Sequence, residues 1–171
     1  MKAIKFDGEL TDDNVSKLLE NIDKYTREEE IIIYFCSNGG GVTNASILSD
    51  YLNRNSYERF TIIIYWECSS AAFNMLFDLK CRVIVKDSAF AIVHMASNKL
   101  EYSELGNRGS ISSFLRDKLD KDNSRELKEF ILAGFTQEEV GLFERGEDLI
   151  FNGIRMRLII DNMKDIRNKV I

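Results

Sequence analysis

Short apolar runs and helically spaced apolar positions alternate along the chain. Residues 31–35 and 60–66 are continuous runs of mainly β-branched and aromatic side chains, which is typical of strands buried on both faces. Shorter strands are predicted over residues 3–6, 82–85, 90–93 and 149–151. Between the strands, apolar residues recur three and four positions apart, and this spacing predicts amphipathic helices.

The predicted helices carry recognisable end signals. Thr11 precedes two aspartates and is a predicted N-cap, and Thr136 with Glu139 forms a capping-box pattern. Gly134 supplies a stop signal, and we expect the tail from Ile154 to contain a helix, a strand and a frayed end. Further helices are predicted over residues 43–53, 70–79 and 111–132. Strands that alternate with helices predict parallel βαβ units and an α/β fold in a single domain.

Composition and charge narrow the class of function. The chain has 171 residues, 44% of them hydrophobic and 30% charged, as expected for one globular domain. A net charge of −5 argues against broad binding to nucleic acid or anionic lipid, and no apolar run approaches the roughly 20 residues of a membrane span. Three cysteines without CxxC spacing, and an N-terminus without a signal-peptide pattern, predict reduced thiols and a cytoplasmic location. Because there is one histidine, a multi-histidine metal site is excluded, and we expect neither metal nor cofactor.

A glycine-rich loop, Cys36-Ser37-Asn38-Gly39-Gly40-Gly41, follows the first long strand. Glycines permit positive φ and close approach of a ligand to backbone N–H groups, so the loop is a candidate oxyanion hole or phosphate cradle. A phosphate-binding loop would need a lysine after the glycines, which is missing here. A flexible turn is the other interpretation.

Two adjacent serines, Ser69 and Ser70, lie where the second long strand meets the next helix. A nucleophile at such a junction stands at the carboxyl edge of the sheet, where open α/β folds bind ligands. The backbone amides that follow would stabilise negative charge as it develops. Either serine is also a suitable helix N-cap, and from these residues alone the cap is the more frequent role.

Two further residues could complete a catalytic set. His94 ends the predicted strand 90–93, and Asp148 precedes the predicted strand 149–151. A serine nucleophile needs an imidazole that takes its proton and a carboxylate that fixes the imidazole tautomer. The alternatives are that the lone histidine is structural and that Asp148 is a solvated acid in a charged run.

Four segments in this order resemble the proteolytic subunit family of the Clp proteases, including its phage-encoded and head-maturation-like relatives. The segment IIIYFCSNGG resembles the family's strand followed by Asn-Ser-Pro-Gly-Gly, and WECSSAA resembles its Gly-x-Ala-Ala-Ser element. The segment AFAIVH resembles the strand that ends in Met-Ile-His, and FTQEEVGLFERGEDLIF the helix and turn that deliver the catalytic aspartate. The resemblance covers residues 4–161, and it departs from the family at residues 66–69, where a glycine and two alanines are replaced.

The resemblance implies a role for each candidate residue. Ser70 would be the nucleophile, His94 the general base and then acid, and Asp148 the orienting carboxylate. One gap in the alignment would move the nucleophile to Ser69, but Ser70 is preferred because small residues then follow it, as in the phage-like members. The oxyanion hole would be formed by the amide of Gly39 or Gly40 together with that of Ala71.

The resemblance also implies an architecture and an activity. The fold would be a Clp/crotonase-type spiral of ββα units in one domain, with a protruding handle helix. The head would cover residues 1–97 and 135–171, and the handle residues 98–134. The predicted activity is that of a serine endopeptidase that cleaves peptides or unfolded proteins, assembled as a homo-oligomeric ring of seven subunits or two such rings. An ATPase unfoldase partner is left open.

Two alternatives remain at this point. The altered residues 66–69 favour a catalytically inactive ring subunit or scaffold with the same fold. A crotonase-type acyl-CoA enzyme would share the spiral core, but no adenine or pantetheine site is recognisable in the sequence.

Overall fold

The computed structural model describes residues 1–94, 121, 124–125 and 127–170, and these residues form a mixed α/β structure. They divide into two compact units. The first unit is Met1–Val93 together with Leu149–Ile171, and the second is His94–Asp148. The α/β class is thereby confirmed, whereas the predicted head and handle boundaries stay a prediction.

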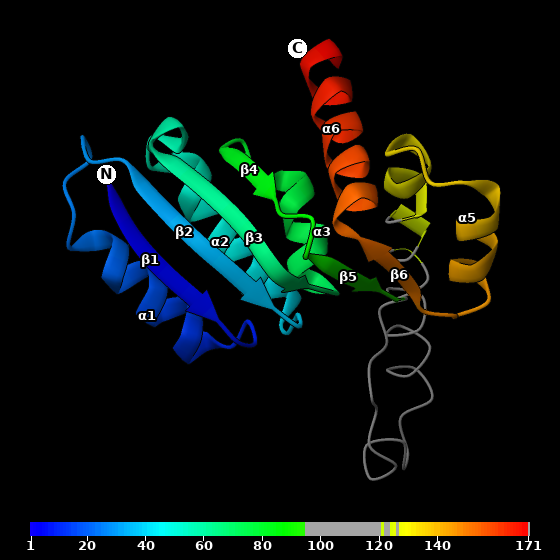
Figure 1. Cartoon of the computed structure of the whole chain (residues 1–171), viewed down its shortest axis with the longest axis horizontal. Coiled ribbons are helices and arrows are strands. Elements are labelled where there is room, and N and C mark those ends of the chain that lie inside the picture. Colours follow the sequence, from blue (N-terminus) through cyan, green and yellow to red (C-terminus); the bar gives the residue numbers. More distant parts are fainter. Residues whose placement is uncertain (95–120, 122–123, 126, 171) are drawn as a thin grey trace, which may run out of the picture. The chain divides into compact units, whose positions relative to one another are not determined.

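The first unit is built on a six-stranded mixed sheet with the order β1-β2-β3-β5-β6, and β4 also pairs with β3 (Figure 1). The strands are β1 (Lys2–Asp7), β2 (Ile31–Ser37), β3 (Phe60–Cys68), β4 (Arg82–Val85), β5 (Phe90–Val93) and β6 (Leu149–Asn152). The six strands whose bounds were predicted from the sequence are confirmed, whereas the further strand predicted in the C-terminal tail is not. The pairs among β1 to β5 are parallel, as predicted, but β6 runs antiparallel to β5. The prediction assumed a βαβ crossover between neighbouring strands, whereas residues 94–148, which form the second unit, separate β5 from β6 in the chain.

The central strand β3 brings three loops to one edge of the sheet. Its first half pairs with β4, and near its end Glu67 lies opposite Phe90 of β5. On its other side, Cys68 lies opposite Ser37, the last residue of β2. The carboxyl ends of β2, β3 and β5 therefore meet, and the glycine loop and the serine doublet both lie at that edge.

Four helices pack in a row beside the sheet. Each contacts the next in the order α1, α2, α3 and α6. Their bounds are α1 (Asp12–Asp23), α2 (Val42–Arg54), α3 (Ala71–Asp78) and α6 (Gly153–Val170), with a short 3-10 helix η1 (Tyr57–Arg59) before β3. The predicted N-cap is confirmed, since Thr11 Oγ1 accepts a hydrogen bond from Asn14 N at 3.3 Å.

The C-terminal tail differs from the prediction, because its described residues form one helix, α6, without a strand. The buried side chains of this helix recur at helical spacing, which explains why the segment is helical. They are Met156, Ile159, Ile160 and Met163.

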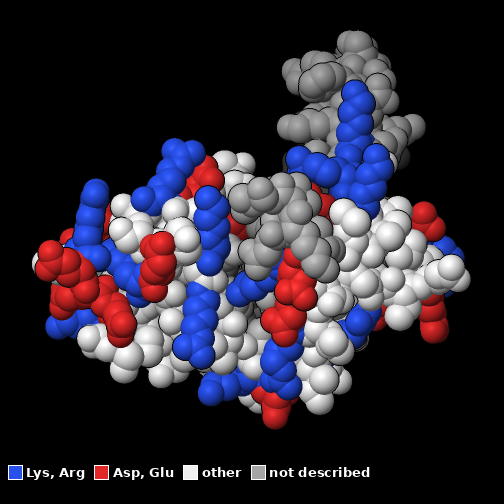
Figure 2. All heavy atoms as spheres, turned by 90° about the horizontal axis from the view of Figure 1, so that it is seen from above, with Lys and Arg blue, Asp and Glu red and all other residues white. Residues whose placement is uncertain are grey.

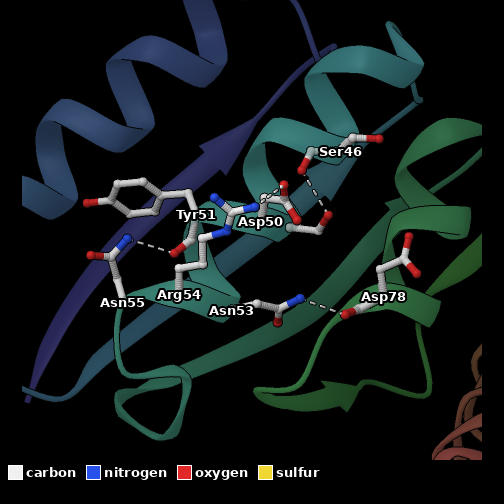
Figure 3. A network of polar contacts seen from close by, with 8 residues as sticks. Ser46, Asp50, Tyr51, Asn53, Arg54, Asn55 and Asp78 are labelled. Carbon is white, nitrogen blue, oxygen red and sulfur yellow. Dashed lines mark hydrogen bonds and ion pairs between the residues drawn. The ribbon is translucent and has the colours of Figure 1, made fainter.

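Polar side chains at the end of α2 attach it to the end of α3. Asn53 Nδ2 donates to the Asp78 carbonyl at 2.8 Å (Figure 3). Asn53 Oδ1 accepts from Lys80 N, also at 2.8 Å. Asn55 Nδ2 also donates to the Tyr51 carbonyl at 2.8 Å and closes the last turn of α2. These bonds fix the helix that begins directly after the serine doublet.

The second unit contains α5 (Gln137–Glu144) and a small aromatic core. The Phe130 ring stacks on Phe135 at 4.4 Å between centroids and meets Phe143 edge-on at 5.0 Å. The predicted capping box at Thr136 is confirmed, and the helical residues 127–132 end at Gly134, whose φ is +83°. Most of the predicted helix 111–132, and most of the predicted handle, lies outside the described residues.

Acidic and basic side chains are interspersed on the face of the molecule drawn in Figure 2. In the part of the chain that the structure describes, no helix has the length and apolar character needed to cross a membrane. Within the same residues, no group of three or more His, Cys, Asp or Glu side chains is placed to hold a metal ion.

Candidate active site

The glycine loop after β2 is tied to its surroundings by hydrogen bonds. Ser37 Oγ accepts from Gly39 N at 3.2 Å, and the Gly39 carbonyl accepts from Leu10 N at 2.7 Å. The Ser37 carbonyl in turn accepts from Ser69 N at 2.9 Å. These bonds give the loop a defined shape beside the serine doublet, which argues against the flexible-turn interpretation.

Gly39 lies directly against Ser70. An added Cβ at Gly39 would stand 2.7 Å from Ser70 Cβ, 3.0 Å from the Ser69 carbonyl oxygen and 3.3 Å from Ser70 Oγ. The φ of Gly39 is +109°, a backbone conformation that L side chains rarely adopt. Both observations explain why glycine stands here, and they place the loop backbone next to the candidate nucleophile.

Ser70 has a strained backbone. Its φ of 54° and ψ of −130° lie outside the regions that non-glycine residues normally occupy. Ser70 N donates to the Ile92 carbonyl at 2.8 Å, which holds the turn against β5. Although Ser70 occupies the N-cap position of α3, its side chain makes no capping hydrogen bond, so the structure does not support the N-cap interpretation for its hydroxyl group.

The neighbouring Ser69 is fully engaged in structural contacts. Its side chain is only 3% exposed. Ser69 Oγ accepts from Ile92 N at 2.9 Å and donates to Glu67 Oε1 at 2.8 Å. Because both the proton and an acceptor position of this hydroxyl group are in use, the geometry favours Ser70 over Ser69 as the reactive serine.

One backbone amide of the glycine loop and one directly after Ser70 have no acceptor within the described residues. Gly39 N donates to Ser37 Oγ and Gly41 N to the Leu10 carbonyl, whereas Gly40 N and Ala71 N make no such bond. Ala71 is the first residue of α3, where an amide has no intrahelical partner. The sequence left Gly39 and Gly40 as equal candidates for the oxyanion hole, and the hydrogen bonds favour Gly40 with Ala71.

The three cysteines of the chain are not activated nucleophiles. Burial raises the pKa of Cys68, which is fully buried, and also that of half-buried Cys36. Burial likewise raises the pKa of Cys81, to about 11. All three are free thiols, and because the thiolate is the reactive form, they are poor nucleophiles at neutral pH.

His94 and Asp148 leave the same end of one strand pair. Val93 of β5 lies opposite Leu149 of β6 in the antiparallel register. His94 follows Val93 and Asp148 precedes Leu149, so the predicted base and its predicted carboxylate partner each adjoin the last pair of this ladder. Both residues are exposed. The predicted triad is thus divided between the units: Ser70 belongs to the first, and His94 and Asp148 belong to the second.

A cavity of about 260 Å³ lies elsewhere in the first unit, where Lys5, Tyr34 and Tyr65 line it. Lys5 Nζ forms an ion pair with Asp7 Oδ2 at 2.7 Å, and Tyr65 Oη donates to the same oxygen at 3.1 Å. The lysine charge is therefore already balanced, and none of the predicted site residues lines this cavity.

Sequence reasoning missed three residues that shape the site, namely Ser37, Glu67 and Ile92. Ser37 stood within the glycine motif, but its role depends on the fold of the loop. Glu67 belongs to residues 66–69, where the sequence departs from the family pattern, and what the sequence did not indicate is its bond to Ser69. Ile92 acts through its backbone N–H and carbonyl groups, so no side-chain pattern could have identified it.

We expect the substitution Gly39→Ala to lower the free energy of unfolding by about 2–4 kcal/mol, because it adds a backbone clash to the strain of a positive φ. The control is Gly8→Ala, since Gly8 also has a positive φ (+142°) but its added Cβ would meet only Asn14 Nδ2, at 3.5 Å. Urea unfolding of both variants, followed by far-UV circular dichroism, separates the two contributions. Equal losses in the two variants would contradict the close contact between Gly39 and Ser70.

A second prediction concerns the strain at Ser70. We expect Ser70→Gly to be more stable than Ser70→Ala by about 1 kcal/mol, because glycine adopts this φ and ψ without strain. At exposed Ser46, in the middle of α2, the order should reverse, since glycine in a helix is about 1 kcal/mol less stable than alanine. Thermal unfolding of the four variants tests this reversal, and the same order at both positions would refute the strain.

Comparison with known proteins finds no protein-family model and no curated protein that matches this chain.

Proposed function

We propose that this chain is a serine peptidase of the Clp protease type, with Ser70 as nucleophile, His94 as general base and Asp148 as the carboxylate that orients the imidazole. The substrate class is a peptide or an unfolded protein. The proposal requires the two compact units to bring the three side chains together.

In the proposed reaction, Ser70 Oγ attacks the carbonyl carbon of the scissile peptide while an imidazole nitrogen of His94 takes the hydroxyl proton. The carbonyl oxygen becomes an oxyanion that accepts hydrogen bonds from the amides of Gly40 and Ala71; each such donor is typically worth about 3–4 kcal/mol. As the C–N bond breaks, the imidazolium returns the proton to the leaving amine. Water, deprotonated by His94, then hydrolyses the acyl-enzyme and restores the Ser70 hydroxyl group.

The observation that carries this proposal is the strained turn at Ser70. A side chain on a positive-φ residue between a strand and a helix is held out at the sheet edge, and such strain persists mainly at functional sites. Gly39 packed against Ser70 and the amides of Gly40 and Ala71 without acceptors add the parts that acyl transfer needs. A serine that served only as a helix cap would need none of these.

The resemblance to the Clp proteolytic subunits extends the proposal to the assembly. The chain would adopt the family's spiral of ββα units, with residues 98–134 as the handle, and would form rings of seven subunits, single or stacked. Sedimentation velocity at micromolar concentration tests the ring, because a monomer of 19.7 kDa and a heptamer differ sevenfold in mass.

The activity is tested by labelling with a fluorophosphonate probe, which forms a covalent adduct only with an activated serine. We expect a single adduct on Ser70 in the native chain and none in Ser70→Ala, with Ser69→Ala still labelled. Peptide mapping by mass spectrometry identifies the modified residue. An adduct on Ser69 would reassign the nucleophile.

The inactive-scaffold alternative is favoured by one observation, the engagement of Glu67 and Ser69 in a hydrogen bond where the family has small residues. A ring that assembles but never labels with the fluorophosphonate would establish that alternative and overturn the peptidase proposal.

A further inference from the structure

We propose that Ser69 is a positioning residue, whose hydroxyl group, oriented by Glu67, locks β5 onto the strained turn and so holds Ser70 ready to react. The inference rests on the proposed peptidase function and identifies a residue that acts through its neighbour rather than on the substrate.

The attachment between β3 and β5 is short, and it ends in this contact. Only one residue pair, Glu67 with Phe90, joins the two strands in regular register among the described residues. Three residues after Glu67 and two after Phe90, Ser70 N donates to the Ile92 carbonyl at 2.8 Å, as the parallel register requires. The other polar group of Ile92, its N–H, would normally find a carbonyl of β3.

The Ser69 side chain replaces that carbonyl. Ile92 N donates to Ser69 Oγ at 2.9 Å instead of to the backbone. Because the chain turns sharply at Ser70, the Ser69 hydroxyl group takes the place of a β3 carbonyl as the acceptor. This replacement occurs directly before the residue whose backbone is strained. The N–H group of Ile92 is thus bonded to the Ser69 side chain, and its carbonyl group is bonded to Ser70 N.

Glu67 fixes the direction of the hydroxyl proton. Ser69 Oγ donates to Glu67 Oε1 at 2.8 Å, so a lone pair of the oxygen is left for Ile92 N. Without this acceptor, the hydroxyl group is free to rotate. The backbone of Ser69 adds two bonds, since its N–H donates to the Ser37 carbonyl at 2.9 Å and its carbonyl accepts from Ala72 N at 3.1 Å.

The consequence for the proposed chemistry follows from chain connectivity. Ile92 lies two residues before His94, so a bond that fixes Ile92 to the turn fixes the strand that leads into the general base. A displacement of about 1 Å between reacting groups can cost roughly a hundredfold in rate. Ser69 is therefore placed to control the rate of acylation without touching the substrate.

The test compares two equally buried serines. Ser69→Ala removes the hydroxyl group that bonds to Ile92 N and Glu67. Ser49→Ala removes the hydroxyl group of a serine that is also 3% exposed and that donates to the Ser46 carbonyl within α2. We expect Ser69→Ala to slow the limiting rate of fluorophosphonate labelling at Ser70 about tenfold, with half-saturation changed less than twofold. The number of labelled sites per folded chain should stay constant. Ser49→Ala should label at the native rate.

Hydrogen exchange at the Ile92 amide gives a readout that does not depend on activity. We expect exchange at least tenfold faster in Ser69→Ala and unchanged in Ser49→Ala. Should Ser69→Ala fail to fold, Glu67→Ala replaces it, with smaller effects in the same direction, and Glu67→Gln should restore the native values because its amide oxygen still accepts from Ser69.

The outcomes separate the two proposals. Faster exchange together with slower labelling supports the positioning role. Labelling within twofold of the native rate in Ser69→Ala, or unchanged exchange at Ile92, overturns it while leaving the peptidase proposal intact. A native chain that protects Ile92 but never labels Ser70 overturns the peptidase function, and with it the positioning role.

Discussion

The substitution Gly153→Ala is expected to lower the free energy of unfolding by about 3 kcal/mol or more, which is a large part of the stability of a typical domain. Gly153 is the first residue of α6, directly after β6. A Cβ at this position would overlap the Lys86 carbonyl oxygen, and Asp87 backbone atoms would lie 3.1 and 3.2 Å from it. All three contacts are with backbone atoms, so no side-chain rotation relieves them.

The matched control is Gly41→Ala, at the residue that precedes the first turn of α2. Gly41 has an ordinary φ of −67°, and its added Cβ would meet the Asn44 side chain first, at 2.9 Å. We expect this control to lower the free energy of unfolding by less than about 1 kcal/mol, because a flexible side chain can move aside. Urea unfolding followed by the fluorescence of Trp66, the only tryptophan, reports on the first unit. Similar midpoints for the two variants would show that the turn after β4 does not pack on Gly153 as described.

The elements that were predicted correctly from the sequence are those that depend on interactions between residues close together in the chain. The β-branched runs that became β2 and β3 are too short and too apolar for surface helices, and Thr11 and Thr136 are caps whose hydrogen bonds close within three residues. Such features depend on neighbours along the chain. They can therefore be predicted from the sequence without knowledge of any tertiary contact.

The features that were missed depend on contacts distant in sequence. The antiparallel direction of β6 beside β5 is a tertiary feature, and apolar periodicity carries no information on strand direction. The strained turn at Ser70 likewise lies against Gly39, which is 31 positions earlier in the chain. From residue types alone, Ser70 was indistinguishable from an ordinary N-cap. The geometry of its turn and the bonds of Ser69 are what separate the two serines.

We expect the proposed triad to act as one unit, so that the rate losses caused by replacing its members are not additive. Ser70→Ala and His94→Ala should each lower the kcat for peptide hydrolysis by a factor of at least about 10³, and Asp148→Asn by a similar factor, because each removes a part that the others need. The double variant Ser70→Ala/His94→Ala should then be no slower than Ser70→Ala alone. If the two residues contributed independently, the losses in kcat would instead multiply, and the double variant would be slower than the native chain by a factor of about 10⁶.

The comparison that isolates Asp148 is Glu144→Gln, which neutralises another exposed acid of the same charged run. We expect this variant to retain the native rate, because a solvent-screened surface charge contributes little to a proton transfer between groups in direct contact. Rates are measured on chains whose circular dichroism matches the native protein. Additive losses for Ser70→Ala and His94→Ala, or equal losses for Asp148→Asn and Glu144→Gln, would show that the alcohol, the imidazole and the carboxylate do not meet. The strained turn at Ser70 would then have to be explained by another chemistry at the same edge of the sheet.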